Sequence, residues 1–168
     1  MSYFVTGATG FIGRFLVDKL LARDGDIFVL LRRGSVKKLE ELRARWGAGA
    51  ERVVPVIGDL ARPNLGLAPA DIARLKGKVK HFFHLAAIYD LAADAESQEK
   101  ANIDGTRHAV ELAAAIDAGC FHHVSSVAAA GLYDGVFRED MFEEAEELDH
   151  PYFRTKHESE GIDRKSVV

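Results

Sequence analysis

Tyr152 and Lys156 form the residue pair with the clearest chemical potential, because they lie four positions apart in a segment of helical pattern. This spacing puts both side chains on one face of a helix. A nearby ammonium group stabilises a phenolate, which makes the phenol a usable proton donor to a carbonyl. Such pairs also arise by chance, as a surface tyrosine beside a solvated lysine. The pair indicates acid–base chemistry only where other residues agree.

A second candidate site is the sequence TGATGFIG, from Thr6 to Gly13, which follows an apolar strand pattern and opens a helix. Gly7 permits a tight turn, Gly10 allows the backbone to approach a pyrophosphate, and Gly13 allows close helix–strand packing. The helix N-terminus offers free N–H groups and a positive dipole end to phosphates. The alternative is a purely structural turn. Because the pattern lies between a strand and a helix, it favours dinucleotide binding.

The second predicted strand ends in Leu30-Leu31-Arg32-Arg33. An acidic residue usually stands here when the adenosine ribose carries a free 2′-hydroxyl group. Guanidinium groups instead suit a 2′-phosphate, which a carboxylate would repel. The alternative is that the arginines begin a basic surface helix. Arg32 and Arg33 therefore favour NADP(H) over NAD(H).

Short apolar runs alternate with longer segments of helical period, which predicts an α/β fold. The predicted strands are Tyr3–Thr6, Ile27–Leu31, Val53–Ile57, Phe82–Leu85 and Phe121–Ser125. Helical segments are predicted after the glycine run and over Val36–Trp46, Pro69–Lys76, Glu96–Ala118 and Tyr152–Arg164. This alternation predicts a doubly wound parallel sheet, the Rossmann fold, with strand order 3-2-1-4-5 and helices on both faces.

Composition narrows the class of protein. The chain has 168 residues, which fits one domain, and its net charge of 22 − 26 = −4 argues against a nucleic-acid binder. No apolar run approaches the ~20 residues of a membrane span. The N-terminus lacks a basic leader, and the single cysteine, Cys120, favours a reducing compartment, so we expect a cytoplasmic protein. The seven histidines are not spaced as joint ligands along their strands, so no metal site is predicted.

Three further motifs lie at the ends of predicted strands and agree with the glycine run and the Tyr-x-x-x-Lys pair. Val124-Ser125-Ser126 closes the fifth predicted strand, Gly58-Asp59-Leu60 ends the third, and His84-Leu85-Ala86-Ala87 ends the fourth. Together with the glycine run and the Tyr-x-x-x-Lys pair, this order resembles the extended short-chain dehydrogenase/reductase family. The resemblance covers the chain to about Glu160.

The resemblance implies a role for each matching residue. Ser126, rather than Ser125, would hydrogen-bond the substrate oxygen, Tyr152 would be the acid–base, and Lys156 would hold the nicotinamide ribose. Asn102 would support the lysine through water or backbone. The implied cofactor-binding residues, besides Lys156, are Gly7, Thr9, Gly10, Phe11, Ile12, Gly13, Arg32, Arg33, Asp59, Leu60, Ala86 and Ala87.

Within the family, three segments resemble the fatty-acyl and thioester reductase branch: the Val-Leu-Leu-Arg-Arg strand end, the alanine-rich serine segment, and Phe142-Glu143-Glu144. The implied function, in lipid metabolism, is NADPH-dependent reduction of an acyl thioester or fatty aldehyde. The acyl group would be carried on coenzyme A or an acyl carrier protein. An NAD-dependent sugar-nucleotide epimerase or dehydratase and a non-catalytic dinucleotide-binding module remain alternatives.

Family members continue beyond the Tyr-x-x-x-Lys helix with a sixth strand and a substrate domain. We therefore expect residues 1–168 to form an incomplete NAD(P)-binding Rossmann domain. With the fifth strand as an unpaired edge, we expect residues 1–168 alone to be prone to aggregation. We also expect them to bind NADPH weakly and to lack reductase turnover.

Overall fold

The computed structural model describes residues 1–166, which form one parallel sheet of five strands in the order β3-β2-β1-β4-β5. The predicted fold and strand order are confirmed. The strands are β1 (Ser2–Thr6), β2 (Ile27–Leu31), β3 (Val53–Ile57), β4 (Val79–His84) and β5 (Phe121–His123). The α-helices are α1 (Phe11–Leu21), α2 (Val36–Trp46), α3 (Pro69–Leu75), α4 (Ala95–Gln98), α5 (Gly105–Ala115) and α6 (Pro151–Arg164).

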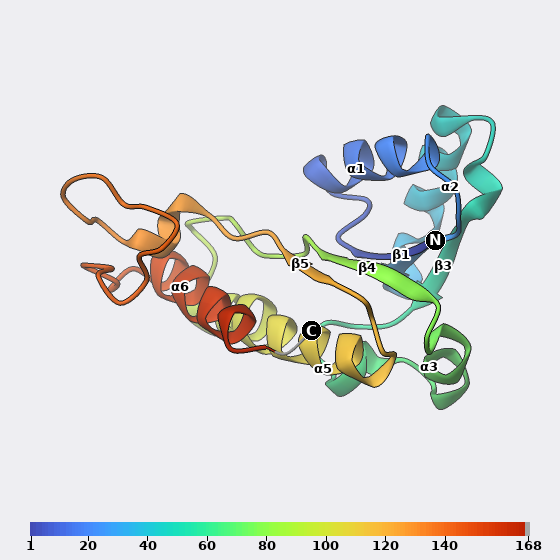
Figure 1. Ribbon diagram of the computed structural model, residues 1–168. Coiled ribbons are helices and arrows are strands. Elements are labelled where there is room, and N and C mark those ends of the chain that lie inside the picture. The colour runs from blue at the N-terminus through green and yellow to red at the C-terminus, as the bar shows by residue number, and fades with distance from the viewer. Residues whose placement is uncertain (167–168) are drawn as a thin grey trace.

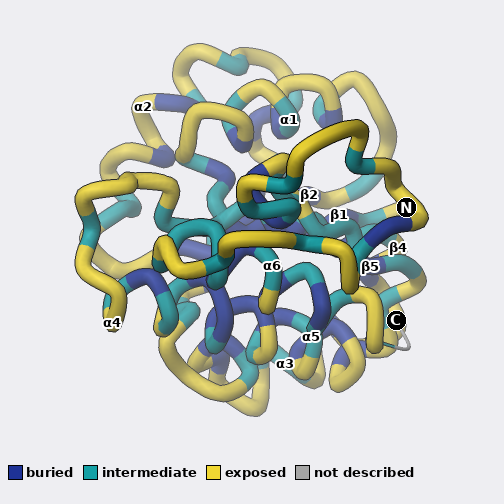
Figure 2. The backbone as a smooth tube through the Cα atoms, turned by 90° about the vertical axis from the view of Figure 1, so that its left-hand side faces the viewer, coloured by how far each residue is buried: buried dark blue, intermediate teal, exposed yellow. Residues whose placement is uncertain are grey.

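Helices cover both faces of the sheet: α1 and α2 lie on one side, and α3, α5 and α6 lie on the other (Figure 1). Each face has its own apolar core. Val5 and Val29 pack with Val17 of α1, whereas Phe4 and Phe82 pack with Leu112 of α5. The strands are buried at the centre of the molecule, and the outer faces of the helices are exposed (Figure 2). Both faces are therefore apolar, as a parallel sheet requires.

The segment predicted as one helix, Glu96–Ala118, is divided. Short α4 is followed by a π-helical segment, η4 (Glu99–Asp104), and then by α5. Apolar periodicity cannot distinguish a π turn from an α turn, and π segments are often found at functional sites. In this wider turn Asn102 is 2% exposed and points inward.

The fourth and fifth strands also differ from their predicted bounds. β4 begins at Val79 and ends at His84, and β5 ends at His123. Val124, Ser125 and Ser126 therefore lie beyond the strand, although the Val124 N–H still donates to the His84 carbonyl at 3.1 Å. Three 3₁₀ segments, η1 (Arg33–Ser35), η2 (Ala50–Arg52) and η3 (Pro63–Gly66), lie in the connections of the first half, and a fourth, η5 (Val127–Ala130), follows Ser126.

Within residues 1–166, the helices are too short or too polar to cross a membrane.

Candidate active site

The glycine loop, Gly7–Gly13, joins β1 to α1 through close backbone contacts. Gly7 has a φ of 71°, and a Cβ atom on it would lie 2.9 Å from the Ala86 nitrogen. The Gly10 N–H donates to the Gly7 carbonyl at 2.9 Å. A Cβ atom on Gly13 would lie 2.2 Å from that same carbonyl oxygen. The turn and the close packing predicted for Gly7 and Gly13 are thus present in the backbone.

The start of α1 has no side-chain cap at Gly10, so its first N–H groups face the end of the loop. Such a helix N-terminus attracts a negatively charged phosphate. The loop borders a cavity of about 830 Å³ at the carboxyl ends of the strands. In doubly wound sheets this edge is where ligands bind.

Almost every residue predicted for the site lines this cavity. The exceptions are Arg33 and Asn102. Thr9, Phe11 and Ile12 line it beside the loop glycines; Asp59, Leu60, Ala86 and Ala87 line it from the ends of β3 and β4; Ser126, Tyr152 and Lys156 line it from the last part of the chain. Residues predicted from motifs at opposite ends of the chain are thereby brought to one cavity.

Two cations from the end of β2 and the start of α2 reach the cavity. Arg32 and Lys38 are exposed and line it together with the Ser35 hydroxyl. Arg33 is also exposed but begins the 3₁₀ turn η1 and is not among the lining residues. Arg32 and Lys38 are therefore the cations that line the cavity in this region, and cofactor binding by Arg33 stays a prediction.

Asp59 closes the cavity wall after β3. Its carboxylate accepts a hydrogen bond from the Ala61 N–H at 3.0 Å, and its own N–H donates to the Leu65 carbonyl at 2.7 Å. A Cβ atom on Gly58 would lie 2.3 Å from that carbonyl. The turn is thus held in one conformation, with Asp59 at the cavity.

The three residues predicted to be catalytic, Ser126, Tyr152 and Lys156, lie together at the cavity and are called the catalytic corner. The Tyr152 hydroxyl donates to Ser126 Oγ at 3.5 Å, and Ser126 Oγ also accepts from the Ala128 N–H at 3.2 Å. Lys156 is 4% exposed, and its Nζ donates to the Val124 carbonyl at 3.1 Å. Burial lowers the pKa of Lys156, and the charge of Glu160 opposes this shift. The two hydroxyls and the ammonium group therefore converge on the cavity from η5 and α6.

Ser125 points to a different partner. Its hydroxyl donates to Glu160 Oε2 at 2.5 Å, whereas Ser126 contacts Tyr152. Burial raises the pKa of Glu160, but the hydrogen bonds from Ser125 and Arg164 outweigh burial and leave the pKa below its ordinary value. Glu160 is therefore ionised at neutral pH. Both serines line the cavity, but only Ser126 contacts Tyr152, and its role as the catalytic serine stays a prediction.

A buried polar network lies behind the cavity and consists of Thr6, His84, Thr106, Asn102 and Thr155. Asn102 Oδ1 accepts from the Ile88 N–H at 2.8 Å, and its Nδ2 donates to the Ile88 carbonyl at 3.0 Å and to Thr155 Oγ1 at 3.1 Å. Asn102 thus fixes the backbone that follows β4 and the residue beside Lys156. It does not line the cavity, and its support of Lys156 stays a prediction.

His84 joins this network to β1. Thr106 Oγ1 donates to the Asn102 carbonyl at 2.7 Å, so it accepts from His84 Nε2 at 3.1 Å. His84 Nδ1 then accepts from Thr6 Oγ1 at 2.8 Å. Burial, with His123 and Lys156 nearby, lowers the pKa of His84 to about 3. These contacts suit the neutral ring and connect the end of β1 to α6.

The sequence profile of the Male sterility protein family, NAD_binding_4, matches residues 5–167. The chain belongs to this family. The match confirms the predicted resemblance to extended short-chain reductases, a Rossmann family that binds NAD(P).

Relatives of this male sterility family member include two proteins of known name. A linear gramicidin synthase from Brevibacillus parabrevis is 35% identical over 94% of the chain. A Drosophila melanogaster protein with the provisional name fatty acyl-CoA reductase CG8306 is 34% identical over 73% of it. Among solved structures, the terminal R domain from the myxalamid PKS-NRPS biosynthetic pathway has a TM-score of 0.86 and 31% identity over 98% of the chain. The chain spans 3%, 27% and 45% of these three proteins, respectively.

Sequence reasoning missed several lining residues of this male sterility family member. They come from η1 and α2, from the loop after β4, and from α4 and η4: Ser35, Lys38, Ile88, Tyr89, Ser97 and Lys100. Ser35 and Lys38 are three positions apart, so helical spacing after Arg32 is the signal that could have found them. Ile88 and Tyr89 lie in a loop without a periodic pattern, so no comparable signal exists for them.

Proposed function

We propose that this chain is the NADPH-binding and catalytic part of a reductase that converts an acyl thioester or a fatty aldehyde. The observation that carries the proposal is the catalytic corner. Tyr152 and Ser126 are in contact at 3.5 Å, beside the buried Lys156, in the cavity that the glycine loop borders. The family match and the relatives named for reduction support the same reaction class.

In this proposal NADPH supplies the hydride that reaches the carbonyl carbon. The hydroxyls of Ser126 and Tyr152 bind the carbonyl oxygen, and Tyr152 donates its proton as negative charge develops there. With a thioester, the resulting hemithioacetal expels the thiol and leaves an aldehyde. With an aldehyde, the product is the alcohol. The ammonium group of Lys156 stabilises the phenolate that remains on Tyr152.

NADPH rather than NADH is proposed because two cations line the cavity after β2. A 2′-phosphate would be bound by Arg32 and Lys38, with the Ser35 hydroxyl beside them. The glycine loop and the start of α1 would hold the pyrophosphate.

The substrate class is proposed from the relatives and from apolar residues near the corner. Tyr89 lines the cavity and is 77% exposed, and Val127, next to Ser126, is 94% exposed. Apolar surface beside two hydroxyl groups suits an acyl chain more than a sugar. The acyl group would arrive on coenzyme A or on a carrier protein.

The experiment measures NADPH oxidation with decanoyl-coenzyme A and with decanal, on the complete natural gene product. We expect Tyr152→Phe to lower the reduction rate about 10²- to 10⁴-fold, because general acid catalysis contributes that much. Its NADPH affinity should be unchanged. Tyr133→Phe is the matched control, since Tyr133 packs on Phe137 and is not among the residues that line the cavity.

Three other results would contradict the proposal. A Tyr152→Phe protein with the wild-type rate would remove Tyr152 from the reaction. Tightly retained NAD⁺ with turnover of a nucleotide sugar would favour an epimerase. NADPH binding without turnover of either acyl substrate would favour a non-catalytic module.

A further inference from the structure

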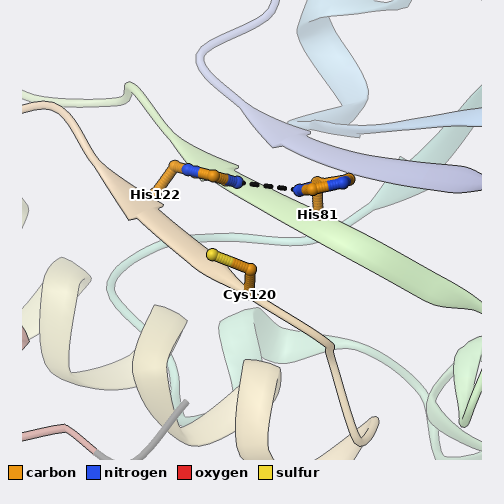
Figure 3. A group of neighbouring side chains, drawn as sticks. All are labelled: His81, Cys120 and His122. Carbon is orange, nitrogen blue, oxygen red and sulfur yellow. Dashed lines mark hydrogen bonds between the residues drawn. The ribbon is translucent and has the colours of Figure 1, made fainter.

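His81, Cys120 and His122 form a cluster away from the cavity, at the pair of strands β4 and β5 (Figure 3). The strands pair with Phe82 opposite Phe121 and Phe83 opposite His122, which brings His81 beside Cys120. His81 Nδ1 and His122 Nε2 are 2.9 Å apart. These two nitrogens and the Cys120 sulfur all lie within 4.8 Å of one another. Three donor atoms, one from β4, one from β5 and one from the residue that precedes β5, thus face one small volume.

Neighbouring aromatic rings hold the two imidazoles in place. The Phe83 ring stacks on His122 with centroids 4.5 Å apart and 13° between the planes. Tyr3 stacks on the other ring, that of His81, at 6.0 Å. All three donor residues are partly buried. The ring orientations are therefore set by packing on the sheet, which lowers the entropy cost of binding an ion there.

The donor set determines which ions could bind. Two imidazole nitrogens and a thiolate are ligands for Zn²⁺ and other late first-row metals, and not for Mg²⁺ or Ca²⁺, which take oxygen ligands. We propose that His81, Cys120 and His122 form a binding site for a Zn²⁺-type ion that links β4 to β5. Water or another small ligand would complete the tetrahedron, as it does where zinc has three protein ligands.

Metal binding at this site has a defined proton balance. Without metal, one N–H lies between the two facing nitrogens. In the metal complex both nitrogens present lone pairs to the ion, so that hydrogen moves to the opposite ring nitrogen of the same imidazole, through solvent. The Cys120 thiol releases one proton as the sulfur–metal bond forms.

The expectation of no metal site rested only on the spacing along each strand. His122 and His123 indeed point to opposite faces of β5. The pairing of His81 on β4 with the β5 residues is a feature of the tertiary fold, and it requires the strand register. This register is the signal that the sequence alone lacked.

The first experiment follows the reactivity of Cys120 in the untagged protein with a thiol-specific disulfide reagent. Cys120 is the single cysteine, so all modified thiol comes from it. We expect one equivalent of Zn²⁺ to slow modification at least about tenfold, because the metal occupies the sulfur, and Mg²⁺ to have no effect. Co²⁺ should give a thiolate-to-metal charge-transfer band and tetrahedral ligand-field bands. An unchanged modification rate with Zn²⁺ would overturn the proposal, and this measurement needs no variant.

The second experiment compares zinc affinity in His122→Gln, Cys120→Ser and the matched control His108→Gln. His108 lies on α5, where its Nδ1 contacts the Leu60 carbonyl, on the other face of the sheet. Loss of an outer-shell partner already weakens metal binding about 10- to 100-fold, so the two ligand variants should lose at least that much. His108→Gln should bind Zn²⁺ as the wild type does. Equal affinity in all four proteins would place the bound metal elsewhere and overturn the site.

Discussion

The glycine loop is built mainly from close contacts between backbone atoms, whereas the catalytic corner is assembled from side chains 26 positions apart in the chain. In the loop, a missing Cβ at Gly7 and Gly13 allows backbone atoms to approach one another. In the corner, Ser126 and Tyr152 meet through their side chains. The loop therefore depends on the steric fit of backbone atoms, and the corner on the packing of side chains.

This difference predicts how each region responds to change. A substitution in the loop acts directly on the backbone and should affect cofactor binding. A substitution in the corner removes a functional group and should affect the rate, with binding preserved. The buried polar network connects the two, because Thr6 immediately precedes the loop and Thr155 immediately precedes Lys156.

The largest change in NADPH affinity is expected for Gly13→Ala. Its Cβ would lie 2.2 Å from the Gly7 oxygen and 2.7 Å from the Ala8 Cα, both of them backbone atoms that cannot rotate away. Relief of such overlap costs roughly 3 kcal/mol, which corresponds to a loss of NADPH affinity on the order of 100-fold. Calorimetric titration measures the affinity, and far-ultraviolet circular dichroism checks that the variant is folded. A folded variant with wild-type affinity would show that the loop is not a backbone-determined site.

The next largest effect is expected at the end of β2, where Arg32 and Arg33 should differ in their contribution to NADPH binding. Arg32 lines the cavity and Arg33 does not. We expect Arg32→Ala to weaken NADPH binding by about 2 kcal/mol, or about 30-fold, and NADH binding much less, because hydrogen bonds to charged groups contribute about 1.5–3 kcal/mol. Arg33→Ala is the matched control and should keep the wild-type ratio of the two affinities. Equal losses for both cofactors in Arg32→Ala would contradict 2′-phosphate recognition.

A pH dependence of stability tests the network between the two regions. In the unfolded chain His84 takes up a proton below its ordinary pKa of 6.5, whereas the folded protein resists protonation down to about 3. Between these two pKa values the unfolded state binds more protons than the folded state. The contribution of His84 to the free energy of unfolding is therefore complete above pH 6.5 and is lost as the pH falls from 6.5 toward 3. The expected loss is about 1.4 kcal/mol per pH unit.

Urea unfolding at several pH values between about 5 and 8 measures this loss. His123, whose pKa burial lowers to about 4, adds a slope of its own. The test is therefore the difference between the wild type and His84→Gln, which cannot titrate. Parallel stability curves for the two proteins would show that His84 is not held neutral by burial.

The sequence was sufficient for the parts of the molecule that depend on local patterns. Strand order and the glycine loop followed from apolar runs and glycine spacing, and the Tyr152–Lys156 spacing placed both residues at the cavity. The contacts of Asn102 with Thr155 and of Ser125 with Glu160 could not be predicted, because both join distant segments to α6. The approach of His81 to Cys120 depends on the strand register. Lys38 lies on α2, beyond the strand end at which the arginine pattern is informative.

The smallest effect, on the free energy of unfolding, is expected for a second glycine-to-alanine change, at Gly105, the first residue of α5. Gly105 has ordinary helical angles, with φ of −59°, and its Cβ would meet the Leu60 side chain at 3.5 Å, a normal van der Waals distance. Because alanine reduces the freedom of the unfolded chain, we expect Gly105→Ala to stabilise the protein by about 0.4–1 kcal/mol in urea unfolding. NADPH affinity should be unchanged, although Leu60 lines the cavity, since no atom must move. A destabilised Gly105→Ala protein would mean that the side-chain packing around Gly105 tolerates an added methyl group no better than the backbone of the glycine loop does. Backbone contacts and side-chain packing would then not differ in their tolerance of substitution.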